Sequence, residues 1–552
     1  MKRLISLLAL LTLVLSGCAT IPRSGMIGYG TDIGSGLTGD NLYYSPTGPD
    51  DGEPQGTILP GFLNAGNGPQ NDYAVARMFL TKQLAVAWQP SKEVLIQVGE
   101  PEFNYQDDGV VYATIRTIAR VDEDGRYFDL PAGSTRTLKY RIKSVAGQWR
   151  ISEAPNLTVL ISPNFKVLFR AYSLYFFDNA RKYLVPEMRW FPSRVSTGTR
   201  MMNALLKGPS DWLAPSVSAI IPAGTKLNIN SVITTDGVAK VDLTAAALKL
   251  SKAKRALMKA QISATLVQLP DVERVEISIQ QSPMDIANGP TGEVEVANTT
   301  PVALTDSGLY HFGVTGMELI YGTANKVAAT GARDFAFDTK EQNLVLTGLS
   351  GSYRYSMTTF GSRPIAIDNR ENQLSPAIDN FGWAWTLTGE ANSELRAFKD
   401  SSRVVSNTWF GDATPVDFAL SEEGSRLASV YYANDTYSTY VQAVHRDNTG
   451  RPLYLGAPRR VDSASGAIDV SWANSNALLT LVPAAGDSVV PWLSEIGGQS
   501  KNITVVQGAY AAISNRVGQI YVLKQNREVV TLREVTWSFL SRGVSAIHIS
   551  GR

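Results

Sequence analysis

The pattern of apolar and polar positions changes early in the chain. Residues 4–15 are almost all apolar and follow Lys2 and Arg3, whereas residues 19–60 are rich in Gly, Pro, Ser, Asp and Thr. A run this short cannot span a bilayer as a helix, and with a positive end before it, it predicts a signal peptide over residues 1–17. The polar stretch has few residues to bury, which predicts a flexible tether over residues 18–60.

Helical and alternating patterns are combined between residues 61 and 182. A helix is expected from an N-cap at Asp72 to Pro90, because proline stops helices. Short alternating segments at 94–98, 110–114 and 139–151 then predict an antiparallel sheet, since turn residues such as Asp124-Gly125 separate them. This combination predicts a small α+β domain. The apolar stripe expected to pack on its sheet comprises Val75, Met78, Phe79 and Val86.

A second α+β domain is predicted over residues 183–284. A short helix is expected at 199–206, and Asp236-Gly237 predicts a hairpin between two strands. A longer helix over 252–269 places apolar side chains on one face, and alternation over 275–279 predicts a last strand. Residues 285–300 are polar and small, which predicts a linker. The apolar positions of the longer helix are Met258, Ile262, Leu266 and Leu269.

Residues 301–552 carry a degenerate repeat of short strands. Five segments resemble one another at steps that average about 44 residues, which is near the length of one propeller blade. The chain is therefore expected to be multidomain, with two small α+β domains followed by an all-β propeller-like domain of about six blades; a large β-sandwich is the alternative. The five segments are 334–338, 381–385, 417–421, 468–472 and 510–514.

Composition and motifs argue against an enzyme and against nucleic-acid binding. Lys plus Arg (51) and Asp plus Glu (50) nearly cancel, so no basic excess indicates a nucleic acid. The three histidines, His311, His445 and His548, have no metal-ligand spacing. Ser251 and Lys254 match S-x-x-K but are read as a helix start, because serine is a favoured N-cap and no K-T-G companion follows. We therefore expect no catalytic residue, no cofactor and no metal.

The sequence Leu15-Ser16-Gly17-Cys18 follows the apolar run and contains the single cysteine of the chain. It resembles a bacterial lipobox, which implies cleavage between Gly17 and Cys18. Cys18 is then expected to become an N-palmitoyl and S-diacylglycerol cysteine. Several acyl chains on one residue give a stable membrane anchor, so we expect a lipid-anchored protein on the extracytoplasmic face of the cell membrane.

Several further segments resemble the LpqB lipoproteins of actinobacteria, along nearly the whole chain. They are residues 61–65 and 88–90, the segments 183–187, 205–210, 237–243 and 261–269 of a GerMN (sporulation and germination) type of domain, and the propeller-like part. The resemblance implies a partner, the extracellular sensor part of the histidine kinase MtrB. It implies modulation of the MtrA–MtrB two-component system in cell-envelope homeostasis and division. It implies no catalytic motif.

A different class of function stays open from the residues alone. A lipoprotein of this kind could bind a cell-wall polymer, glycan or peptide, on aromatic side chains without contacting a kinase. For the leading hypothesis of a protein partner, a group of tyrosines could supply the contact anchors, although tyrosine is more often an ordinary strand residue. The tyrosines are Tyr431, Tyr432, Tyr437 and Tyr440.

Overall fold

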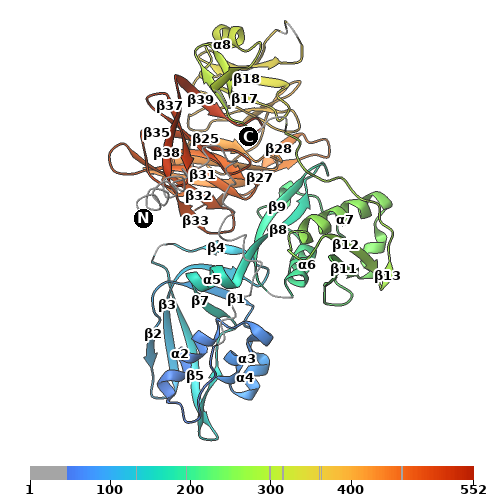
Figure 1. The fold of residues 1–552 in the computed structure, drawn as a ribbon, viewed down its shortest axis with the longest axis vertical. Helices are drawn as coiled ribbons and strands as arrows, with labels where there is room; N and C mark the ends of the chain where they lie inside the picture. Colours follow the sequence, from blue (N-terminus) through green and yellow to red (C-terminus); the bar gives the residue numbers. More distant parts are fainter. Residues whose placement is uncertain are drawn as a thin grey trace, which may run out of the picture. The chain divides into compact units, whose positions relative to one another are not determined.

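The structure is a computed structural model, shown in Figure 1. It describes residues 46–131, 133–193, 196–296, 300–313, 316–359, 361, 363–461 and 464–551. The predicted signal peptide, the cleavage position after Gly17 and the lipidation position Cys18 lie outside the described residues. In the described part of the chain, every helix is either too short or too polar to cross a membrane.

The first folded element begins inside the stretch that was predicted as tether. Helix α2 (Gln55–Ala65) begins before residue 60, so the tether prediction is wrong for residues 55–60. The prediction failed because two adjacent apolar residues in this polar stretch are enough to hold a helix on the core. Ile58 and Leu59 are fully buried in the core of the first domain, and their burial stabilises a helix that starts directly after Pro54.

The first domain is α+β, as predicted. Its sheet runs in the order β6-β5-β3-β1-β7, and β2 and β4 pair with β3. Along β3, most residues alternate between buried and more exposed positions, which is the pattern of a strand with one face on a core. The strands are β1 (Glu93–Gln97), β2 (Glu102–Tyr105), β3 (Val110–Asp122), β4 (Tyr127–Asp129), β5 (Thr135–Val145), β6 (Gln148–Glu153) and β7 (Thr158–Ile161).

The single helix predicted from Asp72 to Pro90 is instead two short helices, α3 (Gln70–Met78) and α4 (Lys82–Ala87). Pairing with β6 interrupts the helix, because the N–H of Thr81 donates to the carbonyl of Ile151 at 2.8 Å. Thr81 is the N-cap of α4, whereas Asp72 has a left-handed backbone with φ 55°. The predicted stripe is consequently split, and Val86 is 88% exposed.

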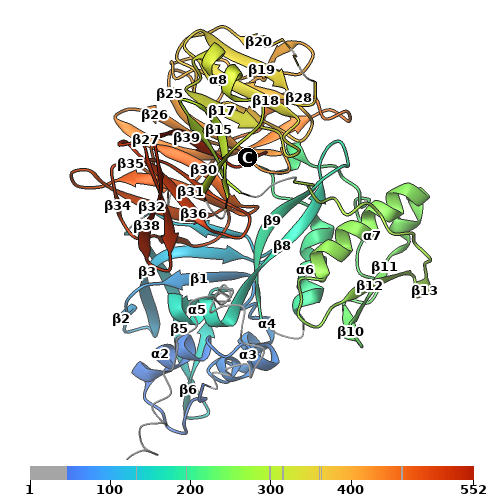
Figure 2. The same cartoon turned by 45° about the horizontal axis from the view of Figure 1, so that its top comes forward.

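The second domain combines a hairpin, two helices and a small sheet (Figure 2). The strands β8 (Phe169–Phe177) and β9 (Leu184–Pro192) pair along their whole length, so the predicted boundary after residue 182 falls inside this hairpin. The helix N-cap at Ser251 is confirmed, because its side chain accepts from the N–H of Lys254 at 3.3 Å. The remaining elements of this domain are α6 (Thr197–Lys207), β10 (Ile233–Thr235), β11 (Val238–Leu243), α7 (Lys252–Leu266), β12 (Arg274–Ile279) and β13 (Ser282–Pro283). Helix α5 (Ser162–Leu168) precedes β8 and packs in the first domain, where Phe165 is buried with residues of β1, β3 and β7.

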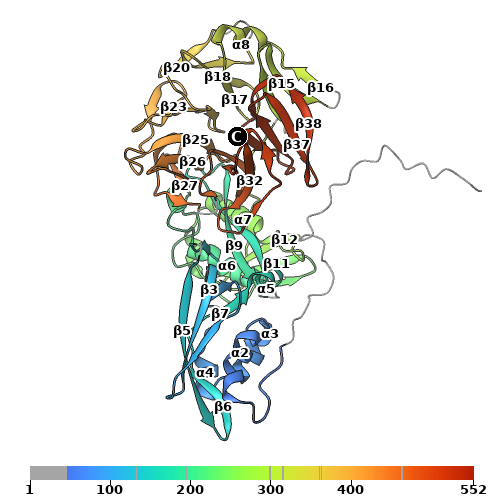
Figure 3. The same ribbon diagram turned by 90° about the vertical axis from the view of Figure 1, so that its left-hand side faces the viewer.

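The third domain consists of six sheets of four or five strands in the described part of residues 302–548, which confirms a propeller of six blades (Figure 3). We number the blades in chain order. Blade 1 is β39-β14-β15-β16, in which the C-terminal strand pairs with the first strand of the domain and closes the ring. Helix α8 (Ala324–Thr330) follows blade 1. The strands of blade 1 are β14 (Val302–Thr305), β15 (Gly308–Gly313), β16 (Gly316–Leu319) and β39 (Val544–His548).

The other five blades each use consecutive strands. Blade 2 has β17 (Asp334–Phe337), β18 (Asn343–Gly348), β19 (Gly351–Ser356) and β20 (Ile365–Asp368). Blade 3 has β21 (Ala377–Ile378), β22 (Ala384–Thr386), β23 (Arg396–Phe398) and β24 (Ser402–Val404). Blade 4 has β25 (Thr414–Leu420), β26 (Arg426–Ala433), β27 (Thr436–Arg446), β28 (Pro452–Leu455) and β29 (Arg459–Arg460). Blade 5 has β30 (Asp469–Asn474), β31 (Ala477–Pro483), β32 (Ser488–Glu495), β33 (Ser500–Asn502) and β34 (Val506–Gln507). Blade 6 has β35 (Ala509–Ser514), β36 (Ile520–Lys524), β37 (Glu528–Arg533) and β38 (Thr536–Arg542).

Four of the five predicted repeat segments fall on the first strand of a blade, and one does not. Segment 381–385 spans a turn and the start of β22, the second strand of blade 3. The first strand of that blade, β21, is only the pair Ala377–Ile378. The prediction took this segment for a first strand because its aromatic residues resemble those of the other repeats. Trp383 and Trp385 are indeed buried, as the apolar residues of first strands are.

Candidate functional site: the central channel of the propeller

The first strands of the blades meet around a cavity of about 220 Å³. Residues from β17, β25, β30, β35 and β39, and the segment leading into β21, line it. In β17, β25 and β30 a polar residue that lines the cavity is followed by an apolar one that is buried between the sheets, as strand alternation requires. The polar residues gathered at the cavity are Asp334, Ser375, Asp417, Asp469, Tyr510 and His548.

Two of these carboxyl groups link one blade to the next through backbone hydrogen bonds. Asp417 of blade 4 accepts from the N–H of Val470 in blade 5 at 2.8 Å. Asp469 of blade 5 accepts from the N–H of Ala512 in blade 6 at 3.0 Å. Because both donors belong to the first strand of the following blade, the two side chains hold neighbouring blades together at the channel wall.

Asp334 occupies the equivalent position in blade 2 but has different partners. It accepts from the hydroxyl of Ser375 at 2.6 Å, and its other oxygen lies 2.6 Å from Nε2 of His548. His548 is on β39, the strand that closes the ring, so this contact joins blade 1 to blade 2. The Tyr510 hydroxyl donates to the carbonyl of Ser545 at 2.9 Å and joins blade 6 to blade 1.

The three carboxyl groups differ in their electrostatics. Burial raises the pKa of Asp417 to about 7, and the charge of Asp334 adds to the rise. Burial, and then the charge of Asp417, raise the pKa of Asp469 well above its usual value. Burial would also raise the pKa of Asp334, but the charge and hydrogen bond of His548 outweigh it and hold that pKa below its usual value.

His548 is the cation of this cluster when it is protonated. Burial would lower the pKa of the imidazole, but the charge and hydrogen bond of Asp334 outweigh that effect and raise it. In the described residues, neither Asp417 nor Asp469 has an ion-pair partner, whereas Asp334 has His548 at 2.6 Å. The arrangement can therefore hold and exchange protons near neutral pH.

The sequence-predicted candidates are otherwise separated in the fold. Of the three histidines, only His548 reaches the channel; His311 pairs with Glu341 at 3.1 Å. Across the described ranges, three or more His, Cys, Asp or Glu side chains are nowhere grouped so that they could hold a metal ion. The channel carboxyl groups were missed by sequence reasoning, although a signal was present. Two of the repeat segments begin with Asp followed by an apolar residue, and a third has this pair at its second and third positions.

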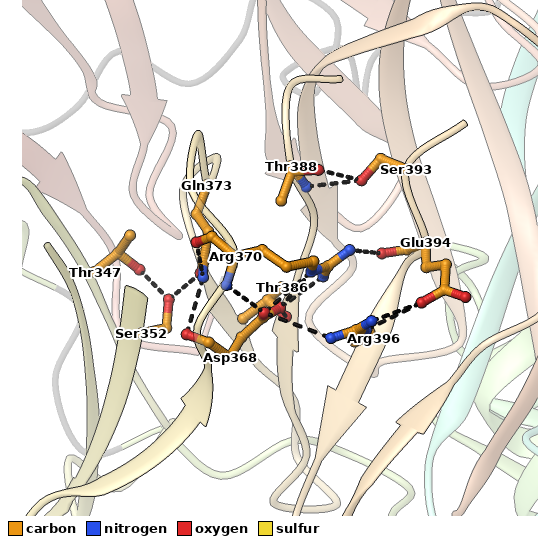
Figure 4. Close-up of polar contacts among 10 residues, drawn as sticks. All are labelled: Thr347, Ser352, Asp368, Arg370, Gln373, Thr386, Thr388, Ser393, Glu394 and Arg396. Atoms are coloured by element: carbon orange, nitrogen blue, oxygen red, sulfur yellow. Dashed lines mark hydrogen bonds and ion pairs between the residues drawn. The ribbon is translucent and has the colours of Figure 1, made fainter. Parts of the chain in front are cut away.

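Another buried carboxyl group, that of Asp368, lies between blades 2 and 3 (Figure 4) and is not among the residues that line the channel cavity. Asp368, whose side chain is fully buried, accepts from Arg370 Nη2 and from the Thr386 hydroxyl, each at 2.6 Å. Arg396 Nη1 lies 3.7 Å from the same carboxyl group. Burial would raise the pKa of Asp368, but the hydrogen bonds from Arg370 and Thr386 outweigh it and lower the pKa.

The predicted tyrosine anchors on blade 4 have unequal access to solvent. Tyr431 is 7% exposed and stacks on Phe410 with ring centroids 3.9 Å apart, so it is a packing residue. Tyr432 is 37% exposed, and the centroid of its ring lies 4.8 Å from that of Tyr437. Trp409, which the sequence reasoning did not single out, is 54% exposed.

Family models match the chain in three consecutive blocks. Residues 48–166 match the N-terminal domain of lipoprotein LpqB. Residues 173–285 match the sporulation and spore germination domain, and residues 309–546 match the β-propeller domain of lipoprotein LpqB. The order of the blocks is that of the three folded domains.

Curated relatives with the name lipoprotein LpqB match over long segments. The protein from Thermobifida fusca (strain YX) is 26% identical over 55% of this chain, and the match spans 51% of its own length. Those from Bifidobacterium longum (strain NCC 2705) and Corynebacterium diphtheriae (strain ATCC 700971 / NCTC 13129 / Biotype gravis) are 24% and 25% identical, over 74% and 79% of this chain and 72% and 78% of their own lengths. With the three domain models in the same order, these matches show that the chain belongs to the LpqB family of lipoproteins.

Proposed function

We propose that this chain is a non-catalytic lipoprotein, anchored through Cys18 on the extracytoplasmic face of the membrane, that binds and modulates a sensor histidine kinase. The observation that carries the proposal is the family itself, which consists of lipoproteins, in a chain whose single cysteine is at position 18 after an apolar run. The resemblance to LpqB adds the MtrA–MtrB two-component system as the pathway and the extracellular part of the kinase as the partner.

The domain organisation supports a role in protein contacts. Three folded modules follow the anchor, and each has a buried core of its own. Propellers present a rigid surface to partners, because each blade is held by its neighbours on both sides. A fold of this kind hosts many functions, so the kinase partner rests on the family resemblance and not on the blades.

The test uses the chain from residue 19 onward as bait on membranes, with mass spectrometry of what it retains. We expect a sensor histidine kinase, and we expect its loss when the extracellular domain of that kinase is deleted. Recovery of the kinase with that domain deleted would contradict the proposal. A matched Cys18→Ala chain, followed through membrane fractionation, tests the anchor separately: it should leave the membrane fraction, whereas the unmodified chain should stay there.

One observation favours a second function, the binding of a cell-wall glycan or peptide. Tyr432 and Tyr454 on blade 4 are 37% and 41% exposed, and Trp409, in the loop before β25, is 54% exposed. Exposed aromatic rings are frequent contact residues of binding surfaces. Sedimentation of the chain with purified peptidoglycan tests this function, with Trp409→Ala as the variant that should weaken retention and Val517→Ala, at another exposed apolar position, as the matched control.

A further inference from the structure

Five of the six junctions between neighbouring blades carry a polar link at the channel. His548 and Asp334 join blades 1 and 2, and Asp334 and Ser375 join blades 2 and 3. The links from Asp417 to Val470, from Asp469 to Ala512 and from Tyr510 to Ser545 join blades 4 to 5, 5 to 6 and 6 to 1; the contacts are those of the described residues. The central ring of the propeller is therefore held by groups that titrate.

The carboxyl groups at equivalent positions of blades 2, 4 and 5 differ in their hydrogen-bond and ion-pair partners. Asp334 has a histidine at 2.6 Å, which balances its charge. Asp417 and Asp469 are on adjacent blades and have backbone N–H donors, but in the described part of the chain they have no cation within ion-pair distance. A carboxylate in a poorly hydrated site without a cation is unfavourable when it is ionised, and two of them repel each other.

We propose that Asp417 and Asp469 form a proton-operated latch that couples the closure of the propeller ring to the pH outside the cell. In the protonated form, the two neighbouring carboxyl groups face one cavity without repulsion and still accept from the N–H groups of the next blades. When both ionise, their repulsion acts across the junctions between blades 4, 5 and 6 and loosens the ring. The latch does not depend on the kinase partner; its exposure to the medium outside the cell rests on the proposed membrane anchoring.

Among the described residues, the other titratable groups that line this cavity belong to the innermost strands of the blades. These groups are Asp334 on β17, Tyr510 on β35 and His548 on β39. The charge of Asp334 raises the pKa of both carboxyl groups, and His548 lowers that of Asp417. Burial raises the pKa of Tyr510, and the charge of Asp334 adds to the rise, whereas the charge of Arg527 opposes it. Arg527 has Asp306 as its own ion-pair partner at 2.8 Å.

The direction of the effect follows from the raised pKa of the folded state. A carboxyl group with a raised folded pKa adds stability below its unfolded pKa of about 3.9. This contribution is lost as the pH rises through the folded value, which is about 7 for Asp417. The latch therefore predicts a propeller that is more stable in mildly acidic than in mildly alkaline medium.

The experiment measures Tm of the purified full chain at a series of pH values between 5 and 8, for the unmodified chain and for Asp417→Asn. Asparagine keeps an acceptor for the Val470 N–H and cannot ionise. We expect the Tm of the variant, relative to the unmodified chain, to increase by about 2–4 °C between pH 5 and pH 8. The matched control is Asp412→Asn, an exposed position on the loop before β25, for which the difference should not change with pH.

A difference between Asp417→Asn and the unmodified chain that is constant across this pH range would overturn the latch. A second measurement needs no variant at the pair, in case Asp417→Asn folds poorly. Infrared difference spectra of the unmodified chain should show a protonated carboxyl band that disappears as the pH rises through about 7. If all protonated carboxyl bands have already disappeared when the pH, raised from acid, reaches 5, the latch proposal would likewise be overturned.

Discussion

Two carboxyl groups in the same propeller are withdrawn from water, and their pKa values are shifted in opposite directions. Asp368, between blades 2 and 3, is surrounded by the guanidinium groups of Arg370 and Arg396 and has a lowered pKa. Asp417, at the channel, has only backbone donors in the described structure and a pKa raised to about 7. Both accept hydrogen bonds that link blades. The side-chain hydrogen bonds from Arg370 and Thr386, together with the charge of Arg370, keep the pKa of Asp368 low, whereas the backbone hydrogen bonds of Asp417 do not offset its burial.

The two sites are two kinds of blade junction. We call Asp368 with its arginines the fixed joint, and the channel pair Asp417 and Asp469 is the latch. An ionised Asp368 with its arginines holds its geometry over the whole physiological pH range, because its charge is lost only in acid. The channel pair, by contrast, has raised pKa values, and that of Asp417 is about 7. Substitutions at the two sites should therefore differ in the size of their effect on stability and in its pH dependence.

The largest effect is expected for Asp368→Ala. The change leaves Arg370 and Arg396 without their shared acceptor and removes the bond from Thr386. Breaking a buried charge pair from one side costs about 3–5 kcal/mol. Because the two arginine side chains are 22% and 34% exposed, water compensates part of this, and we expect the free energy of unfolding to fall by about 2–4 kcal/mol. Urea denaturation of the variant and of the unmodified chain measures this difference in the free energy of unfolding.

The pH dependence of this loss provides its control. Since the folded pKa of Asp368 is lowered, its stabilisation is present above the unfolded pKa and disappears as the pH falls through the folded value. The penalty of Asp368→Ala should thus be constant between pH 5 and pH 8 and shrink below about pH 4. A penalty that grows on acidification would contradict the assignment of Asp368 as an ionised joint.

A smaller effect is expected for His548→Gln. Glutamine retains a donor for Asp334 but no charge, so the ion pair at 2.6 Å becomes an ordinary hydrogen bond. We expect a loss of about 1–2 kcal/mol at pH 6. The raised pKa of His548 means that its contribution is present below the unfolded value and is lost as the pH rises through the folded one. Denaturation at pH 6 and pH 9 should show a smaller loss at the higher pH; equal losses would show that the charge of His548 is irrelevant.

The sequence allowed the propeller to be predicted but not the chemistry of its centre. The segments that begin at Asp334 and Asp417 stood out, as did the one that contains Asp469, because strand alternation places an apolar residue after each aspartate. Whether a cation lies beside each one depends on strands far apart in the chain, such as β39 with His548. No local pattern encodes that pairing.

The failures of prediction have the same physical origin. Residues 72–90 have helical periodicity, yet Thr81 pairs with β6, some seventy residues later, and the helix is split. Segment 381–385 has the composition of a first strand, but Phe381 and Trp383 precede the second strand of blade 3. In both places a tertiary contact overrides a local preference.

Asp469→Asn should have an effect of opposite sign to those at Asp368 and His548. It removes a carboxyl group whose pKa is raised by burial and by the charge of Asp417, and the amide oxygen can still accept from Ala512. Because the cost of a raised folded pKa grows as the pH rises towards that value, we expect a gain in the free energy of unfolding that is larger at pH 8 than at pH 5. Destabilisation at pH 8 would contradict repulsion between the two carboxyl groups.

The smallest effect is expected where an ion pair is exposed. Arg451 Nε lies 3.0 Å from Asp447, and their side chains are 51% and 25% exposed. Solvent screens such a pair, and exposed ion pairs contribute about 0–1 kcal/mol. Arg451→Gln should therefore lower the free energy of unfolding by less than about 1 kcal/mol, and urea denaturation at low and at high salt measures this change. A loss as large as that at Asp368 would mean that ion pairing as such, and not the burial of the carboxyl group between blades, distinguishes the fixed joint from the latch.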